Sequence, residues 1–157
     1  MADRHKTVLI AIGNSYRHDD GVGPVVGEQV AALGRDDIEV VTDIGDGTRA
    51  VEAWDGAMRA ILVDSTVSGR EPGHICSYDG LRDEIPEHLF RACSTHCFGV
   101  TTSIALGRAL GRLPRQLTVY GIEGQDFSMG PGLSPAVVES ARRVTEEILR
   151  TIGPQSR

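Results

Sequence analysis

Several acidic residues of this chain stand where hydrophobic runs end, at positions where strands of a sheet should terminate. In an open parallel sheet the carboxyl ends of the strands share one edge, and ligands bind in the crevice there. We therefore expect carboxylates that are far apart in sequence to converge on one site. The acids are Asp19 with Asp20, Asp43, and Asp64, which follow residues 7–12, 38–42 and 60–63.

A loop histidine is available to join these acids. His96 lies between Cys93 and Cys97, just before a helical pattern. One imidazole with two carboxylates suits a borderline divalent ion such as nickel or zinc, and leaves positions open for ligands from a partner. The two cysteines have C-x3-C spacing without a second pair, and Cys76 is distant, so a structural zinc site is not indicated.

Each of these residues also has a purely structural explanation. Carboxylates before a helix accept its free N–H groups, which accounts for one of the adjacent Asp19 and Asp20. Two adjacent acids repel each other unless a cation or partner donors compensate, which favours a functional role for at least one. Asp64 can cap a turn with the hydroxyl residues after it, and a lone histidine is more often a packing residue.

The hydrophobic pattern predicts the elements that must position these residues. Short apolar runs alternate with segments whose apolar residues recur every three or four positions, as strands and helices do in α/β folds. We expect one domain over residues 1–157, a three-layer α/β/α sandwich with a mostly parallel, doubly wound sheet of about five strands. The expected strands are 7–12, 38–42, 58–63, 75–78 (an edge) and 117–121, and the helices are 22–33, 49–55 capped by Thr48, 97–111, and 135–152 capped by Ser134.

Composition excludes several classes of function. The chain has 157 residues and a net charge of −6, which disfavours a large nucleic-acid or anionic-membrane footprint. Lys6 is the single lysine, so Schiff-base chemistry and lysine-dependent phosphate loops are excluded. No signal peptide or membrane span is evident, and three cysteines cannot all pair within the chain, so we expect a cytoplasmic protein with free thiols.

The pattern of motifs resembles the nickel-iron hydrogenase maturation endopeptidases over roughly the whole chain. Ile12-Gly13-Asn14 followed by Asp19-Asp20-Gly21-Val22-Gly23 is similar to the amino-terminal signature of that family. The remaining segments fall in the family's order and at its spacing. They are Leu62-Val63-Asp64-Ser65, Thr95-His96, Tyr120-Gly121-Ile122-Glu123 and Gly132-Leu133-Ser134-Pro135.

The resemblance implies an endopeptidase that removes a carboxy-terminal extension from a [NiFe]-hydrogenase large-subunit precursor after nickel insertion. It implies that Asp20, Asp64 and His96 contact the metal. On this interpretation nickel arrives with the substrate and is held only weakly by the enzyme alone, and zinc or cadmium can occupy the site in vitro. We expect a monomer whose partner is the precursor.

No residue has the spacing of an activated nucleophile, so we expect a water molecule to attack the peptide bond with help from a carboxylate. Asp19 and Asp43 are the candidate general bases. Residues 43–48 resemble the family's second glycine-rich acidic loop with local variation, which leaves the roles of Asp43 and Asp46 open.

Two alternatives remain open from the sequence. A phosphoacceptor receiver domain also places an acid pair after its first strand and an acid after its third, but it needs a lysine beyond the last strand, where this chain has Glu123. A non-enzymatic nickel-binding assembly module on the same fold would keep the metal site without cleavage.

Overall fold

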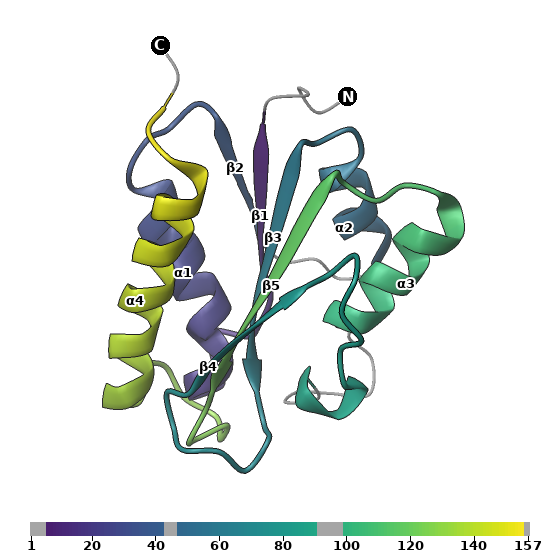
Figure 1. The fold of residues 1–157 in the computed structure, drawn as a ribbon. Coiled ribbons are helices and arrows are strands. Elements are labelled where there is room, and N and C mark those ends of the chain that lie inside the picture. The colour runs from purple at the N-terminus through teal and green to yellow at the C-terminus, as the bar shows by residue number, and fades with distance from the viewer. Residues whose placement is uncertain (1–5, 43–46, 91–98, 156–157) are drawn as a thin grey trace.

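The computed structural model describes residues 6–42, 47–90 and 99–155. Strands and helices alternate along these segments, as the hydrophobic pattern predicts (Figure 1). The strands are β1 (Thr7–Ala11), β2 (Ile38–Val41), β3 (Arg59–Thr66), β4 (Ile75–Asp79) and β5 (Gln116–Glu123). The helices are α1 (Val22–Ala31), α2 (Gly47–Trp54), α3 (Val100–Leu110) and α4 (Pro135–Ile152), with short 3-10 turns η1 (His18–Gly21) and η2 (Glu87–Phe90).

The five strands form one sheet in the order β2-β1-β3-β5-β4. All neighbouring pairs are parallel except β4 with β5, which is antiparallel. The mostly parallel, doubly wound sheet is therefore confirmed, with β4 as the expected edge strand. The chain leaves β1 toward one edge and later returns to β3 on its other side, so the crevice between β1 and β3 is the switch point at which ligands bind in such sheets.

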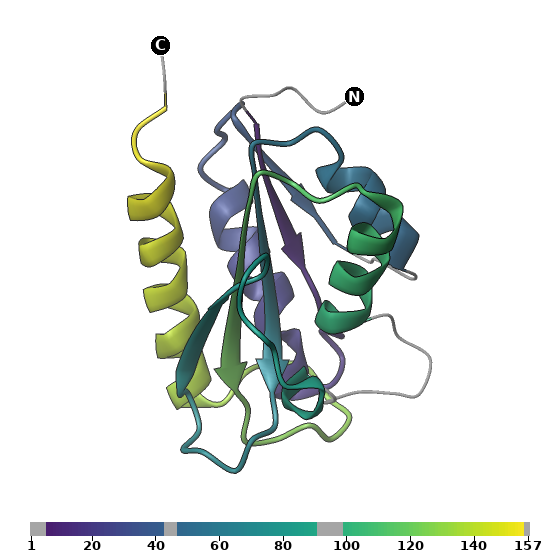
Figure 2. The same cartoon turned by 45° about the vertical axis from the view of Figure 1, so that its right-hand side comes forward.

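Helices cover both faces of the sheet and complete three layers (Figure 2). α1 and α4 pack on one face, where Leu9, Ile61 and Val63 point, while α2 and α3 pack on the other, where Val8 and Ile10 point. β1 is buried along its whole length because both of its faces are covered. Among the described residues, no helix combines the length and the apolar character needed to cross a membrane.

Three details differ from the sequence-based expectation. β3 does not end before Asp64 but continues to Thr66, because β5 extends to Glu123 and pairs with it. α2 begins at Gly47, so Thr48 lies inside the helix rather than before it. Ser134 does precede α4, but its side chain makes no capping bond to that helix.

Glycine at position 23 lets α1 begin directly against the ends of β1 and β3. A Cβ atom at Gly23 would lie 2.2 Å from the carbonyl oxygen of Ile12 and 2.7 Å from that of Val63. Both neighbours are backbone atoms, which cannot rotate away as a side chain can. The first turn of α1 is therefore fixed against the switch point of the sheet.

Substitution Gly23→Ala should consequently destabilise the fold. Overpacking a close contact costs about 1–3 kcal/mol, and the immobile backbone neighbours place this site at the upper end of that range. Urea unfolding of the variant and the wild type measures the difference. Gly34→Asn is the control, because a Cβ at Gly34 meets no atom within 4 Å and asparagine tolerates a positive φ; an equal loss in both variants would contradict the close-approach explanation.

Candidate functional site

Asp20 lies in η1 at the switch point, and its side chain is almost fully buried. One carboxylate oxygen, Oδ2, accepts a hydrogen bond from the backbone N–H of Asn14 at 2.8 Å, and the other, Oδ1, accepts one from the Ser65 hydroxyl at 2.9 Å. These two donors fix the orientation of the carboxylate. A carboxylate oxygen has further lone pairs, so both oxygens can still bind a cation.

Asp64 lies in β3, beside β1, and is also buried. Its Oδ1 accepts the backbone N–H of Ser65 at 2.8 Å. Ser65 thus contacts both acids, through its hydroxyl and through its amide. The structure brings Asp20 and Asp64 together, as the strand order predicted, and it adds Ser65, which the sequence suggested only as a turn residue.

The described part of the chain offers no basic group that neutralises the two carboxylates. Within the described segments, no lysine, arginine or histidine forms an ion pair with either acid. Burial, and then the nearby charge of Asp20, raise the pKa of Asp64 well above its ordinary value. A divalent cation between the two would offset both the burial and the repulsion, so the pair is chemically suited to hold one.

The other residues that the sequence placed at this site lie outside the described residues. They are His96, the proposed third metal ligand, Asp43, a candidate general base, and the thiols of Cys93 and Cys97. Among residues 6–42, 47–90 and 99–155, no group of three or more histidine, cysteine, aspartate or glutamate side chains is close enough to hold a metal. Metal binding by Asp20, Asp64 and His96 therefore stays a prediction.

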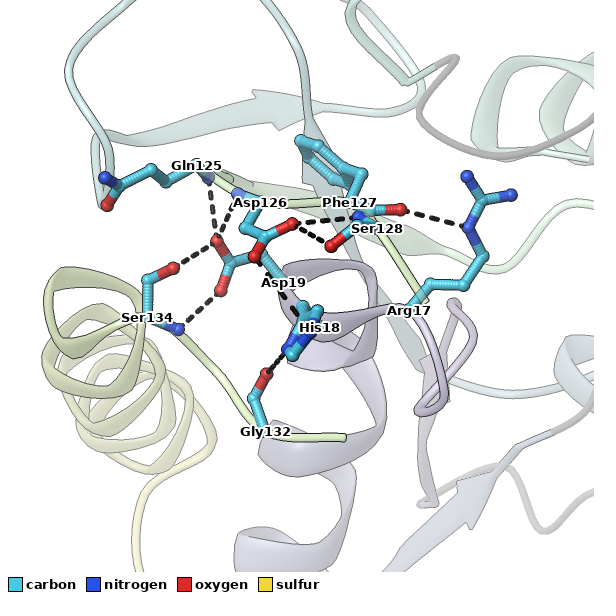
Figure 3. A network of polar contacts seen from close by, with 9 residues as sticks. All are labelled: Arg17, His18, Asp19, Gln125, Asp126, Phe127, Ser128, Gly132 and Ser134. Atoms are coloured by element: carbon cyan, nitrogen blue, oxygen red, sulfur yellow. Dashed lines mark hydrogen bonds and ion pairs between the residues drawn. The ribbon is translucent and has the colours of Figure 1, made fainter. Parts of the chain in front are cut away.

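The Asp19 carboxylate is turned toward the loop between β5 and α4 (Figure 3). Its carboxylate accepts four hydrogen bonds. The backbone N–H groups of Gln125 and Asp126 donate to Oδ2 at 2.8 and 2.9 Å. Ser134 donates twice, from its N–H to Oδ1 and from its hydroxyl to Oδ2, both at 2.7 Å.

Asp19 consequently has the properties of a structural acid. Burial acts to raise its pKa, but the hydrogen bonds from Ser134, Asp126 and Gln125 outweigh burial and lower the pKa below its ordinary value. A carboxylate with a lowered pKa and four donors is a poor proton acceptor. The geometry thus favours Asp19 as the residue that holds its loop in place over Asp19 as the general base that the sequence suggested.

Further bonds fasten the same two loops together. The backbone N–H of His18 donates to the carbonyl of Gly130 at 2.8 Å, and its Nδ1 lies 3.1 Å from the carbonyl of Gly132. Arg17 donates from Nε to the carbonyl of Phe127 at 3.2 Å (Figure 3). The loop that carries Asp20 is therefore braced along its length by residues more than 100 positions away.

Glu123, at the end of β5, organises the loop after β3 in a similar way. Its carboxylate accepts the hydroxyl of Thr66 at 2.7 Å, the N–H and hydroxyl of Ser68 at 2.7 and 2.8 Å, and the N–H of Gly69 at 3.1 Å. Sequence reasoning used Glu123 as part of a motif and as the residue found where a receiver domain needs a lysine, and gave it no structural role. The available signal was the donor-rich stretch of residues 65–69, which follows a buried strand.

The fold is an α/β domain with two buried carboxylates at the switch point of its sheet. The family model described as hydrogenase maturation protease (HycI) matches residues 31–151. This match covers well over half of the chain, so the chain belongs to the hydrogenase maturation protease family and is an endopeptidase. The receiver-domain alternative is thereby not supported. A search among curated proteins found no significant match.

Solved structures with the same fold carry related names. A solution structure of an endopeptidase from Escherichia coli is 20% identical, with a TM-score of 0.77, 94% of this chain covered and 91% of the other. The maturating endopeptidase HybD from E. coli is 18% identical, with a TM-score of 0.72 and the same coverage. HycI from Thermococcus kodakarensis is 21% identical, with a TM-score of 0.68 and coverage of 96% and 94%. At these identities the likeness establishes the fold alone.

Substitution Asp19→Asn should destabilise the fold. An asparagine offers one acceptor oxygen and would turn an NH2 group toward N–H donors, leaving buried donors unpaired at a cost of roughly 2 to 4 kcal/mol. Denaturant unfolding measures this cost. Ser134→Ala removes the one hydrogen bond from the Ser134 hydroxyl but keeps the bonds from the backbone, so it should cost only about 1 kcal/mol. Equal stability of wild type and Asp19→Asn would contradict the structural role.

Glu123 should contribute a pH-dependent part of the stability. Burial acts to raise the pKa of Glu123, but the hydrogen bonds from Ser68, Thr66 and Gly69 outweigh it and hold the pKa below the ordinary 4.5. A carboxyl whose pKa is lower in the folded state stabilises the fold at every pH above its pKa in the unfolded state. This stabilisation is lost as the pH falls through the pKa of the folded state. Glu123→Gln should therefore be less stable than wild type at pH 7 by about 1–3 kcal/mol, and the difference should shrink below pH 4.5. Urea unfolding across this pH range tests both points, and a difference that stays constant would refute the assignment.

Proposed function

We propose that this endopeptidase removes the carboxy-terminal extension of a [NiFe]-hydrogenase large-subunit precursor after nickel has been inserted. The observation that carries the proposal is the pair of buried carboxylates, Asp20 and Asp64, which are joined through Ser65 and have no basic partner among the residues that the structure describes. Such a pair at the switch point of the sheet suits a cation, and the chain belongs to a family of hydrogenase maturation proteases.

Recognition of the precursor on this proposal depends on the nickel that it carries. Asp20, Asp64 and His96 fill coordination positions that the precursor's own ligands leave open. A precursor without nickel would bring no positive charge to offset the repulsion between the two acids, and it would bind less well. Nickel is therefore part of the substrate, held weakly by the enzyme alone, and zinc or cadmium can take its place in vitro.

Cleavage on this proposal uses water rather than a side-chain nucleophile. Ser65 is fully buried, and its hydroxyl donates to Asp20, so it is not free to attack a peptide bond. The acid that removes a proton from the water must have fewer hydrogen-bond donors on its carboxylate than Asp19 has. Asp43 remains the candidate general base.

The cellular setting is also part of the proposal. The net charge of −6 disfavours a large footprint on nucleic acid or anionic membrane. We propose that the protein acts in the cytoplasm as a monomer, on a folded precursor. Free thiols fit that compartment.

The decisive experiment incubates the purified protein with nickel-loaded and nickel-free precursor and follows the mass of the large subunit. Loss of a terminal peptide from the loaded form alone supports the proposal. Binding of the loaded precursor without a change in mass would support the non-enzymatic assembly module. Cleavage of both forms at equal rates would refute recognition through nickel.

Variants of the proposed ligands test their roles. Loss of a residue that merely supports a metal ligand costs about 10- to 100-fold, so Asp20→Asn, Asp64→Asn and His96→Ala should each slow processing by at least about 100-fold. Circular dichroism checks that the fold persists. Asp55→Asn is the matched control, because Asp55 is an exposed acid beside Arg112; undiminished processing by all three variants would refute the ligand assignment.

A further inference from the structure

Two large apolar side chains stand exposed on the loops that surround the site. Tyr16, in the loop after β1, has 72% of its surface exposed, and Met129, in the loop after β5, has 75%. These are the most exposed large hydrophobic side chains among the residues that the structure describes. Single exposed apolar residues are ordinary, but neighbouring ones beside a functional site indicate an interaction surface.

Backbone pairing places these two residues side by side. Arg17 and Gly130 form a parallel bridge, in which the N–H of Gly130 donates to the carbonyl of Tyr16 and the N–H of His18 donates to the carbonyl of Gly130, both at 2.8 Å. Tyr16 and Met129 immediately precede the two bridge partners, so this bridge holds the backbones of the two loops together next to them.

The pair is linked to the acid site through one residue. Asn14 donates its backbone N–H to Oδ2 of Asp20 at 2.8 Å, and its side-chain Oδ1 accepts the backbone N–H of Tyr16 at 2.9 Å. Asn14 thus orients the Asp20 carboxylate through its backbone and positions Tyr16 through its side chain. Tyr16 therefore lies on the same loop as the backbone donor that orients Asp20.

The loops that carry the pair are held rigid before any partner arrives. Asp19, His18 and Arg17 bind the loop after β5 through the contacts described above (Figure 3). Little conformational entropy remains to be lost when the loops are covered, and preorganisation of this kind raises affinity. Tyrosine is enriched among the residues that dominate binding energy, and methionine adapts its shape to a partner.

We propose that Tyr16 and Met129 form a docking surface for the folded hydrogenase large-subunit precursor, and that this surface supplies binding energy independent of the metal. The proposal rests on the proposed function. The occupant follows from burial: Asp20 and Asp64 are only 3% and 5% exposed, so a metal carried by another protein reaches them only if that protein's surface closes over the rim of the site. A surface that closes there covers Tyr16 and Met129.

The test compares the double variant Tyr16→Ser/Met129→Ser with wild type in binding and cleavage of nickel-loaded precursor. Binding should weaken, and kcat/KM should fall, by about tenfold or more. The loss should appear in KM, with kcat at saturation unchanged, because neither side chain contacts the acid pair. Tyr16→Phe keeps the apolar ring and should behave as wild type.

The matched control is Leu33→Ser/Leu110→Ser. Leu33 and Leu110 are 51% and 55% exposed but lie past the ends of α1 and at the end of α3, away from this rim (Figure 1). This control should leave binding and cleavage unchanged. Circular dichroism and urea unfolding confirm that both double variants are folded.

Three results would overturn the docking surface: unchanged binding by the double variant, an equal loss in the control, or no binding of precursor by wild type. A wild-type dimer in sedimentation that the double variant abolishes would assign the surface to self-association instead. Wild-type binding without cleavage would refute the proposed peptidase reaction alone, because the binding comparison still decides the role of Tyr16 and Met129.

Discussion

The hydrogen bonds of the Asp19 carboxylate are the interaction on which the rest of the site depends. One buried side chain pairs with four donors from the loop after β5 and the start of α4, and so joins segments more than 100 residues apart. Asp20 is the next residue in the chain, so its position follows from this anchor. The anchor also explains why Ser134 does not cap its own helix: its hydroxyl is used by Asp19. Helix α4 thus lacks a side-chain cap, and the hydroxyl that could have provided it joins the two loops instead.

Asp20 and Asp64, in contrast to Asp19, are two acids without enough partners to stabilise their charges. They lie close together and are buried, and burial together with the charge of Asp20 raises the pKa of Asp64. The hydrogen bonds that orient the two acids come from Asn14 and Ser65, which carry no charge and do not neutralise them. A site of this kind weakens the empty fold and gains from a cation. On the proposed function, binding energy discriminates between metal-loaded and empty substrates, because only the former relieves the repulsion.

The sequence predicted the layers, the strand order at the switch point and the meeting of Asp20 with Asp64, because buried runs such as residues 7–12 and strand-end acids follow from hydrophobic periodicity and general topology. It could not distinguish Asp19 from Asp20. The two are identical and adjacent, and the direction of each carboxylate depends on donors at Gln125, Asp126 and Ser134 that only the folded chain brings near. The extension of β3 past Asp64 likewise depends on its long-range partner β5, and no local pattern reports it.

The hydrogen bonds between the first loop and the loop after β5 make the two loops one structural unit. Residues 14–20 and 124–134 share their hydrogen bonds so fully that a change in one leaves donors or acceptors unmatched in the other. If the first loop of a relative were grafted onto this protein alone, it would lack its hydrogen-bond partners in the loop after β5. Engineers who wish to redirect this enzyme to another precursor must therefore exchange both segments at once.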